Sequence, residues 1–153
     1  MSTGPADPST WTLPRLRIAA DGTWYHDDGE VTHPGILANL RGNLRVDAVG
    51  HFLQVGPVRI PVEVEDAPWV VERLEREGDR LWLTLGDLSR EPLDPATLVL
   101  GAGEVPYCQV KSGLRARWSR AATWQLLQLA EEDAAGEMVV VLGETRLRVP
   151  RQG

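Results

Sequence analysis

The sequence predicts an α+β fold made of two structurally similar half-domains, each with the order strand-strand-helix-strand-strand. Three observations predict it: short segments that alternate apolar and polar residues, glycine-containing turns between them, and two helix starts at Thr32 and Ser119. The expected halves are residues 13–100, which hold an extra β-hairpin, and residues 101–153. Residues 1–12 contain nothing periodic to bury, so we interpret them as a disordered N-terminal tail.

The first half opens with a β-hairpin. Residues 16–20 and 23–26 flank the dipeptide Asp21-Gly22, which supplies the positive φ angles of a type I′ turn. A short helix is expected next, because Thr32 is typical of an N-cap and Gly42 lies where a helix would end. At about nine residues this helix would not be stable alone, so it should pack on a sheet.

Three more strands follow in the first half. Residues 43–49, 51–55 and 58–64 have the composition or alternation of strands, and a Gly-Pro turn separates the last two. Residues 86–104 are expected to form mostly loop, because they contain several glycines and prolines.

The segment 69–77 fits two structures. Asp66 could cap a helix that Gly78 ends, but the residues also permit a strand. The clean alternation of residues 79–85 favours the strand, because the two segments would then pair as the extra hairpin.

The second half repeats the order of the first. Residues 106–110 and 114–118 are predicted strands, Ser119 caps a helix expected to extend through Asp133, and a final hairpin covers residues 138–150. A shift of 87 residues places Thr32 on Ser119, Leu40 on Leu127 and Gly56 on Gly143. We therefore predict an internal repeat.

Four segments resemble a known family. They are Ile18-Ala-Ala-Asp-Gly-Thr-Trp-Tyr-His26, His33-Pro34, Val58-Arg-Ile-Pro-Val-Glu-Val-Glu-Asp-Ala-Pro68 and the helix from Trp118 to Glu132. Through them, about residues 14–150 resemble the bacterial family called domain of unknown function 1285 (DUF1285). The resemblance implies an α+β protein of two similar motifs with a suggested role in signalling or ligand binding. It also favours a strand over residues 69–76 and implies no catalytic residues.

Composition excludes several classes of function. The chain has 22 acidic and 16 basic residues, a formal charge of −6, so we expect no nucleic-acid partner. No stretch approaches the roughly 18 apolar residues of a membrane span, and no export signal is visible, so we expect no membrane partner and a cytoplasmic location. A single cysteine, Cys108, excludes an internal disulfide and is expected in the core. No motif indicates a cofactor.

The strongest candidate site is a basic hairpin beside the start of the second helix. Its residues form the one basic run with interleaved aromatics, which suits a phosphate or an acidic partner. They are Tyr107, Lys111, Arg115, Arg117 and Arg120. The alternative is that these arginines face solvent on the outer side of a hairpin. The sequence thus favours a non-catalytic module that binds a small anionic ligand or a protein partner.

An acidic site is the second candidate. Glu63, Glu65 and Asp66 lie close together, and neighbouring carboxylates can perform acid–base chemistry or bind a hard cation, as in a metal-assisted hydrolase. Pairing with Arg59 on the same face, or with arginines of a neighbouring strand, is the stronger explanation of these carboxylates.

Two further hypotheses concern metals and self-association. His26 and His33, with the acidic residues between them, are the densest group of possible metal ligands, but their spacing matches no standard site and we predict no metal. A structural homo-oligomer, such as a dimer, would use exposed tryptophans and a sheet edge.

Overall fold

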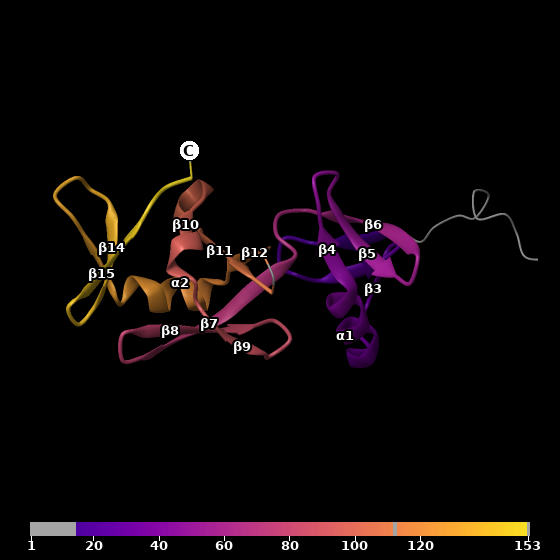
Figure 1. Ribbon diagram of the computed structural model, residues 1–153, viewed down its shortest axis with the longest axis horizontal. Helices are drawn as coiled ribbons and strands as arrows, with labels where there is room; N and C mark the ends of the chain where they lie inside the picture. Colours follow the sequence, from indigo (N-terminus) through magenta and orange to yellow (C-terminus); the bar gives the residue numbers. More distant parts are fainter. Residues whose placement is uncertain (1–14, 112, 153) are drawn as a thin grey trace, which may run out of the picture. The chain divides into compact units, whose positions relative to one another are not determined.

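The computed structural model describes residues 15–111 and 113–152, which form two α-helices, two six-stranded sheets and one three-stranded sheet (Figure 1). The fold is therefore α+β, as predicted. Each six-stranded sheet consists of two groups of three consecutive strands, so the two sheets are similarly organised. The tail predicted for residues 1–12 lies outside the described residues.

The chain divides into two compact units. The first contains the described residues up to Arg17 together with Thr23–Glu63, and the second contains Ile18–Gly22 and the chain from Val64 onward. This division differs from the expected boundary after residue 100. It differs because the 69–85 hairpin, which we expected in the first half, pairs with strands that follow residue 100.

The first six-stranded sheet has the order β3-β2-β1-β6-β5-β4. Leu16, Ile18, Trp24, Leu44 and Leu53 are buried by this sheet and its surroundings. Each predicted strand of this region is present, and the predicted Asp21-Gly22 turn joins the first two strands, with Gly22 at φ 88°. The strands are β1 (Leu16–Ile18), β2 (Trp24–His26), β3 (Gly29–Glu30), β4 (Leu44–Val46), β5 (His51–Val55) and β6 (Val58–Val64).

Helix α1 (Pro34–Asn43) begins one residue later than expected. The N-cap is His33 rather than Thr32, because the His33 Nδ1 atom accepts hydrogen bonds from the backbone N–H groups of Gly35 and Ile36 at 3.1 and 3.3 Å. An imidazole nitrogen here replaces the hydroxyl oxygen that usually satisfies these donors.

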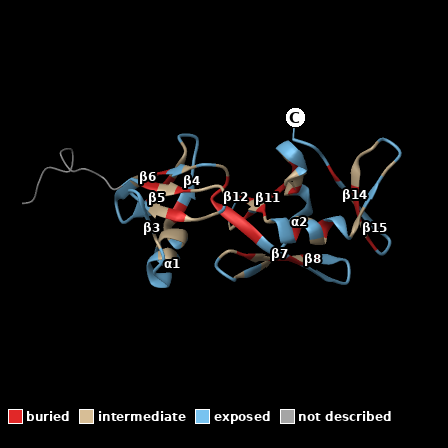
Figure 2. Cartoon of the chain, turned by 180° about the vertical axis from the view of Figure 1, so that it is seen from behind, coloured by how far each residue is buried: buried red, intermediate tan, exposed pale blue. Residues whose placement is uncertain are grey.

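The second six-stranded sheet has the order β10-β11-β12-β7-β8-β9. Its centre is the parallel pair β12 and β7, in which Ala116 lies opposite Trp69 and Trp118 opposite Val71. Segment 69–77 is therefore a strand, and its N-terminal half, Trp69–Val71, is buried. Figure 2 shows this burial along β7. The strands are β7 (Trp69–Glu77), β8 (Arg80–Leu85), β9 (Arg90–Pro92), β10 (Val99–Leu100), β11 (Pro106–Val110) and β12 (Leu114–Trp118).

The segment 86–104 is more ordered than its composition suggested. It contributes the short strands β9 and β10 as well as two 3-10 turns, η2 (Pro95–Thr97) and η3 (Ala102–Glu104). Asp94 caps η2 through its side chain. Proline and glycine here terminate short elements rather than exclude them.

Helix α2 (Arg120–Leu127) is capped by Ser119 as predicted, but it ends six residues before the expected Asp133. Residues Ala130–Glu132 instead form strand β13, which pairs with β14 (Met138–Leu142). Strand β15 (Thr145–Val149) completes a separate three-stranded sheet, so the second half does not form one sheet around its helix. The internal repeat therefore stays a prediction.

Among the described residues, no helix combines the length and apolar character needed to cross a membrane.

Candidate ligand-binding pocket

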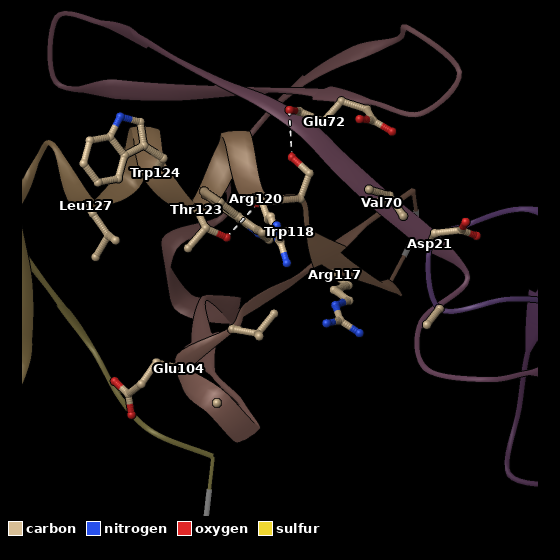
Figure 3. Close-up of a pocket in the computed structure, with 14 residues that line it drawn as sticks. Asp21, Val70, Glu72, Glu104, Arg117, Trp118, Arg120, Thr123, Trp124 and Leu127 are labelled. Carbon is tan, nitrogen blue, oxygen red and sulfur yellow. Dashed lines mark hydrogen bonds between the residues drawn. The ribbon is translucent and has the colours of Figure 1, made fainter.

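A pocket of about 640 Å³ lies in the second unit beside helix α2 (Figure 3). Val70 of β7 and Trp118 of β12 line it, α2 forms one wall, and η3 with the following Val105 forms another. The turn residues Ala20 and Asp21 complete the lining.

Helix α2 is fixed to the sheet through an irregularity in β7. The register between β7 and β8 shifts between Val71 and Arg73, which leaves the Glu72 backbone without a regular partner in that ladder. Ser119 fills this position: its N–H donates to the Val71 carbonyl and its hydroxyl to the Glu72 carbonyl, each at 2.9 Å. The Gln125 side chain accepts from the Leu74 N–H at 2.7 Å. These bonds fix the orientation of α2 and so determine which of its side chains line the pocket.

The α2 wall combines aromatic and apolar side chains with the polar Arg120 and Thr123. Ala122 and Leu126 are buried against the protein, whereas Trp124 is 65% exposed and Leu127 is 45% exposed. Arg120, Trp124 and Leu127 follow the i, i+4, i+7 spacing of one helix face, and all three line the pocket. An exposed indole on a fixed helix offers a flat surface on which an aromatic ligand can stack.

Arg117 supplies positive charge from the sheet. Its Nη1 atom donates to Asp66 Oδ2 at 3.1 Å, and the Tyr107 hydroxyl donates to the same oxygen at 2.7 Å. We call Asp66, Tyr107 and Arg117 the Asp66 cluster. Burial, reinforced by the neighbouring Asp66 carboxylate, raises the pKa of Tyr107, so the hydroxyl keeps its proton and continues to donate.

The predicted basic residues separate into three groups. Arg117 and Arg120 line the pocket. Arg115 lies over the Tyr107 ring, 4.0 Å from its centroid, and donates to the Gln152 side chain at 2.9 Å. Lys111 lies at the hairpin turn, where its ammonium group is 4.0 Å from Asp87 and 5.5 Å from the Trp69 ring centre. Two of the five predicted residues therefore line the pocket.

The positive and negative side chains that line the pocket point in different directions. Figure 3 shows the Arg117 guanidinium directed into the space, while the carboxylates of Asp21, Glu72 and Glu104 are turned outward at its rim. Glu104 is bound by Arg151 at 2.9 and 3.0 Å, and this pairing lowers the pKa of Glu104. Arg120 makes no ion pair within the described part of the chain.

The residues of the acidic candidate site have different partners. Arg15 binds Glu63 at 3.4 Å, the Ala20 N–H donates to Glu65 at 3.2 Å, and Asp66 belongs to the cluster described above. Among residues 15–111 and 113–152, no three metal-ligating side chains are grouped closely enough to hold an ion.

Cys108 lies in the core, as expected. Burial raises the pKa of its thiol to about 11, and the Trp118 indole donates to its sulfur at 3.3 Å. A thiol with this pKa is a poor nucleophile at neutral pH.

Trp124, Leu127 and Glu104 line the pocket but were not predicted as site residues from the sequence. The signal for the first two was the helical spacing from Arg120, which places them opposite the buried Ala122 and Leu126. Glu104 had no comparable signal, because its place beside the pocket depends on the turn η3 and on Arg151, 47 residues away.

The comparisons with known proteins concern the fold. The sequence matches no protein-family model, and no curated protein matches it significantly. The structure resembles a DUF1285 family protein from Silicibacter pomeroyi DSS-3, with a TM-score of 0.74, 21% identity, and coverage of 97% of this chain and 89% of that chain. A DUF1285 family protein from Shewanella baltica OS155 gives a TM-score of 0.66 and 20% identity, covering 76% of this chain and 92% of that chain. The chain therefore has the fold of DUF1285 family proteins, which agrees with the resemblance of its sequence motifs.

Proposed function

We propose that the protein is a non-catalytic binding module whose second unit binds a small ligand with an aromatic body and an anionic group. The observation that carries the proposal is that Arg117, Arg120 and the exposed indole of Trp124 all line one pocket. This narrows the anionic ligand that the sequence suggested to one with an aromatic part.

The size and lining of the pocket suit a small molecule. Ligand pockets typically enclose about 300–1,000 Å³ and combine an apolar lining with a few polar groups that orient the ligand. This pocket has a volume of about 640 Å³, and its apolar wall comes from Trp124, Leu127 and Val70.

The anion would bind to the two arginines. Asp66 uses one nitrogen of Arg117, which leaves the remaining guanidinium donors available for a carboxylate or phosphate. Arg120 adds a second positive charge from the first turn of α2. The aromatic part would then stack on Trp124 and displace water from Leu127.

The residues considered for catalysis have structural partners or are buried. The three carboxylates that could have served a hydrolase have separate structural partners, and the Cys108 thiol is buried. We therefore prefer a binding module to a hydrolase that would use these residues.

Isothermal titration calorimetry with two naphthyl probes tests the proposal. The probe 1-naphthyl phosphate carries an aromatic body and an anion, and 1-naphthol lacks only the phosphate. We expect the phosphate to bind at least about tenfold more tightly, since a charge-assisted contact to arginine contributes roughly 1.5–3 kcal/mol. Arg120→Ala and Trp124→Ala should each weaken the binding of 1-naphthyl phosphate.

Two variants away from the pocket serve as matched controls. Arg148→Ala removes an exposed arginine that pairs with Glu137 at 2.6 Å on the three-stranded sheet. Leu88→Ala removes an 81% exposed apolar side chain that does not line the pocket. Both should bind 1-naphthyl phosphate like the unmodified protein. Absence of binding, or equal losses in the control and pocket variants, would refute the proposed site.

A further inference from the structure

The last described residues, 150–152, form a strap along the edge of the second sheet, beyond β10. The Leu100 N–H donates to the Pro150 carbonyl at 2.9 Å, and the Gln152 N–H donates to the Leu100 carbonyl at 2.8 Å. Arg151 and Leu100 are thus parallel bridge partners. Figure 1 shows this yellow end of the chain beside β10. The strap adds one more paired segment to the sheet that forms the pocket.

The strap reaches the pocket through Arg151. Its Nε and Nη2 atoms donate to the two oxygens of Glu104 at 2.9 and 3.0 Å, the bidentate geometry that is most specific for a carboxylate. Glu104 lines the pocket, and Figure 3 shows its carboxylate turned toward the C-terminal segment and away from Arg117. A second contact, from Arg115 to Gln152 at 2.9 Å, fixes the same strap.

The backbone of Glu104 is itself constrained. Its φ of 62° lies in the left-handed region, which a side-chain-bearing residue occupies only when its surroundings hold it there. The η3 turn provides this hold, since the Glu104 N–H donates to the Gly101 carbonyl at 3.2 Å and the Gly101 N–H to the Val105 carbonyl at 2.7 Å. The backbone therefore places Glu104 at the wall of the pocket, and Arg151 holds its carboxylate in the observed direction.

We propose that Arg151 is a specificity-determining residue that makes the pocket selective for anions by holding and neutralising Glu104. This inference rests on the proposed function, because it concerns the charge preference of the same pocket. Without Arg151, the Glu104 carboxylate would be an unpaired negative charge in the lining, where it would repel an anion and compete with it for Arg117. The Arg151 guanidinium lies outside the pocket lining, so it acts on the ligand through Glu104.

A double-mutant cycle on the full chain tests this role. The variants are Arg151→Gln, Glu104→Gln and the combination, each titrated with 1-naphthyl phosphate. We expect Arg151→Gln alone to weaken binding about threefold to tenfold, as one nearby unpaired charge would. The double variant should return to within about twofold of the unmodified protein, because the repelling carboxylate is gone.

Recovery of binding in the double variant distinguishes an effect of the Glu104 charge from a structural effect of losing Arg151. If Arg151 served only to pin the strap, removing the Glu104 charge would restore nothing, so a double variant as weak as Arg151→Gln would overturn the inference. Arg148→Gln breaks a comparable exposed ion pair elsewhere in the second unit and should leave binding unchanged.

The outcomes also distinguish the two proposals. If the unmodified protein binds 1-naphthyl phosphate through Arg120 and Trp124 but Arg151→Gln binds equally well, the role of Arg151 is wrong and the pocket stands. If the unmodified protein does not bind the probe, both proposals fall.

Discussion

Asp66 Oδ2 accepts a hydrogen bond from the guanidinium of Arg117 at 3.1 Å, so one residue of each predicted site lies in the same cluster. Asp66 was a candidate for an acidic site and Arg117 for a basic one. Tyr107 donates to the same oxygen, so Oδ2 of Asp66 orients both neighbours. In this structure Asp66 positions an arginine that lines the pocket.

Removing the Tyr107 hydroxyl should weaken the Asp66 cluster. Tyr107→Phe eliminates one partly buried hydrogen bond, and we expect the free energy of unfolding to fall by about 0.5–1.5 kcal/mol. Urea denaturation followed by tryptophan fluorescence measures this change. Tyr25→Phe is the control, since the Tyr25 hydroxyl makes no hydrogen bond to any described residue, and its stability should be nearly unchanged. Equal losses in the two variants would contradict the role of the cluster.

Gly101 is required by the ring of Tyr107. A Cβ atom at this position would lie 2.5 Å from Tyr107 Cε2 and 2.9 Å from Cδ2, and the ring cannot move easily because its hydroxyl is bound to Asp66. We expect Gly101→Ala to lower stability by about 1–3 kcal/mol.

A second glycine gives the opposite expectation. Gly42 lies within helix α1, and a Cβ there would meet nothing within 4 Å. Gly42→Ala should therefore raise stability by about 0.5–1 kcal/mol, because alanine has the better helix propensity. Thermal unfolding of the two variants compares their stabilities directly. A Gly101→Ala protein as stable as Gly42→Ala would contradict the close packing of Gly101 against the Tyr107 ring.

Local patterns predicted most strands, because alternation and turn glycines act over a few residues. The 69–85 hairpin was recognised from its own alternation, but its sheet depends on the pairing of Ala116 with Trp69, 47 residues apart. No local sequence pattern specifies a pairing between residues so far apart in the chain. The end of α2 was missed for a similar reason, since Ala130 becomes a strand residue only by pairing with Val140.

Part of the pocket lining could be predicted from the sequence. Arg117 and Arg120 were identified from charge and spacing, and both line the pocket. Lys111 was grouped with them by proximity in the sequence, yet it lies beside Trp69 and Asp87, because a hairpin turn directs it elsewhere. The pairing of Asp66 with Tyr107 joins residues 41 positions apart and could not be deduced from either one alone.

The Cys108 thiol should be unreactive in the native protein. With a pKa of about 11, only about one thiol in a thousand is ionised at pH 8, and the side chain is buried. We expect iodoacetamide to label Cys108 slowly in buffer and rapidly in denaturant, as followed by mass spectrometry. Rapid labelling of the native protein would contradict the core position of this residue.

The Asp47–Arg59 pair should give the first unit an acid-sensitive contribution to stability. Arg59 binds both carboxylate oxygens, at 2.6 and 3.0 Å, and this bonding holds the pKa of Asp47 well below its ordinary value of 3.8. A lowered pKa in the folded state means that the contribution is present above 3.8 and is lost as the pH falls below it.

The difference in unfolding midpoint between the unmodified protein and Asp47→Asn should thus be largest near neutral pH and shrink on acidification. Asp28→Asn is the control, because Asp28 is exposed and forms no ion pair with the described residues. A difference that stays constant from pH 7 to pH 2.5 would show that the Asp47 carboxylate does not stabilise the fold.

The most direct test of the binding pocket is to locate a bound probe by NMR. The indole N–H resonance of Trp124, assigned by its loss in Trp124→Phe, is followed during titration with 1-naphthyl phosphate. We expect this resonance and the backbone amides of Arg117, Arg120 and Leu127 to shift together along one saturable curve, with 1-naphthol producing much smaller changes. Saturable shifts confined to other residues, with the Trp124 indole unmoved, would contradict the pocket as the ligand site.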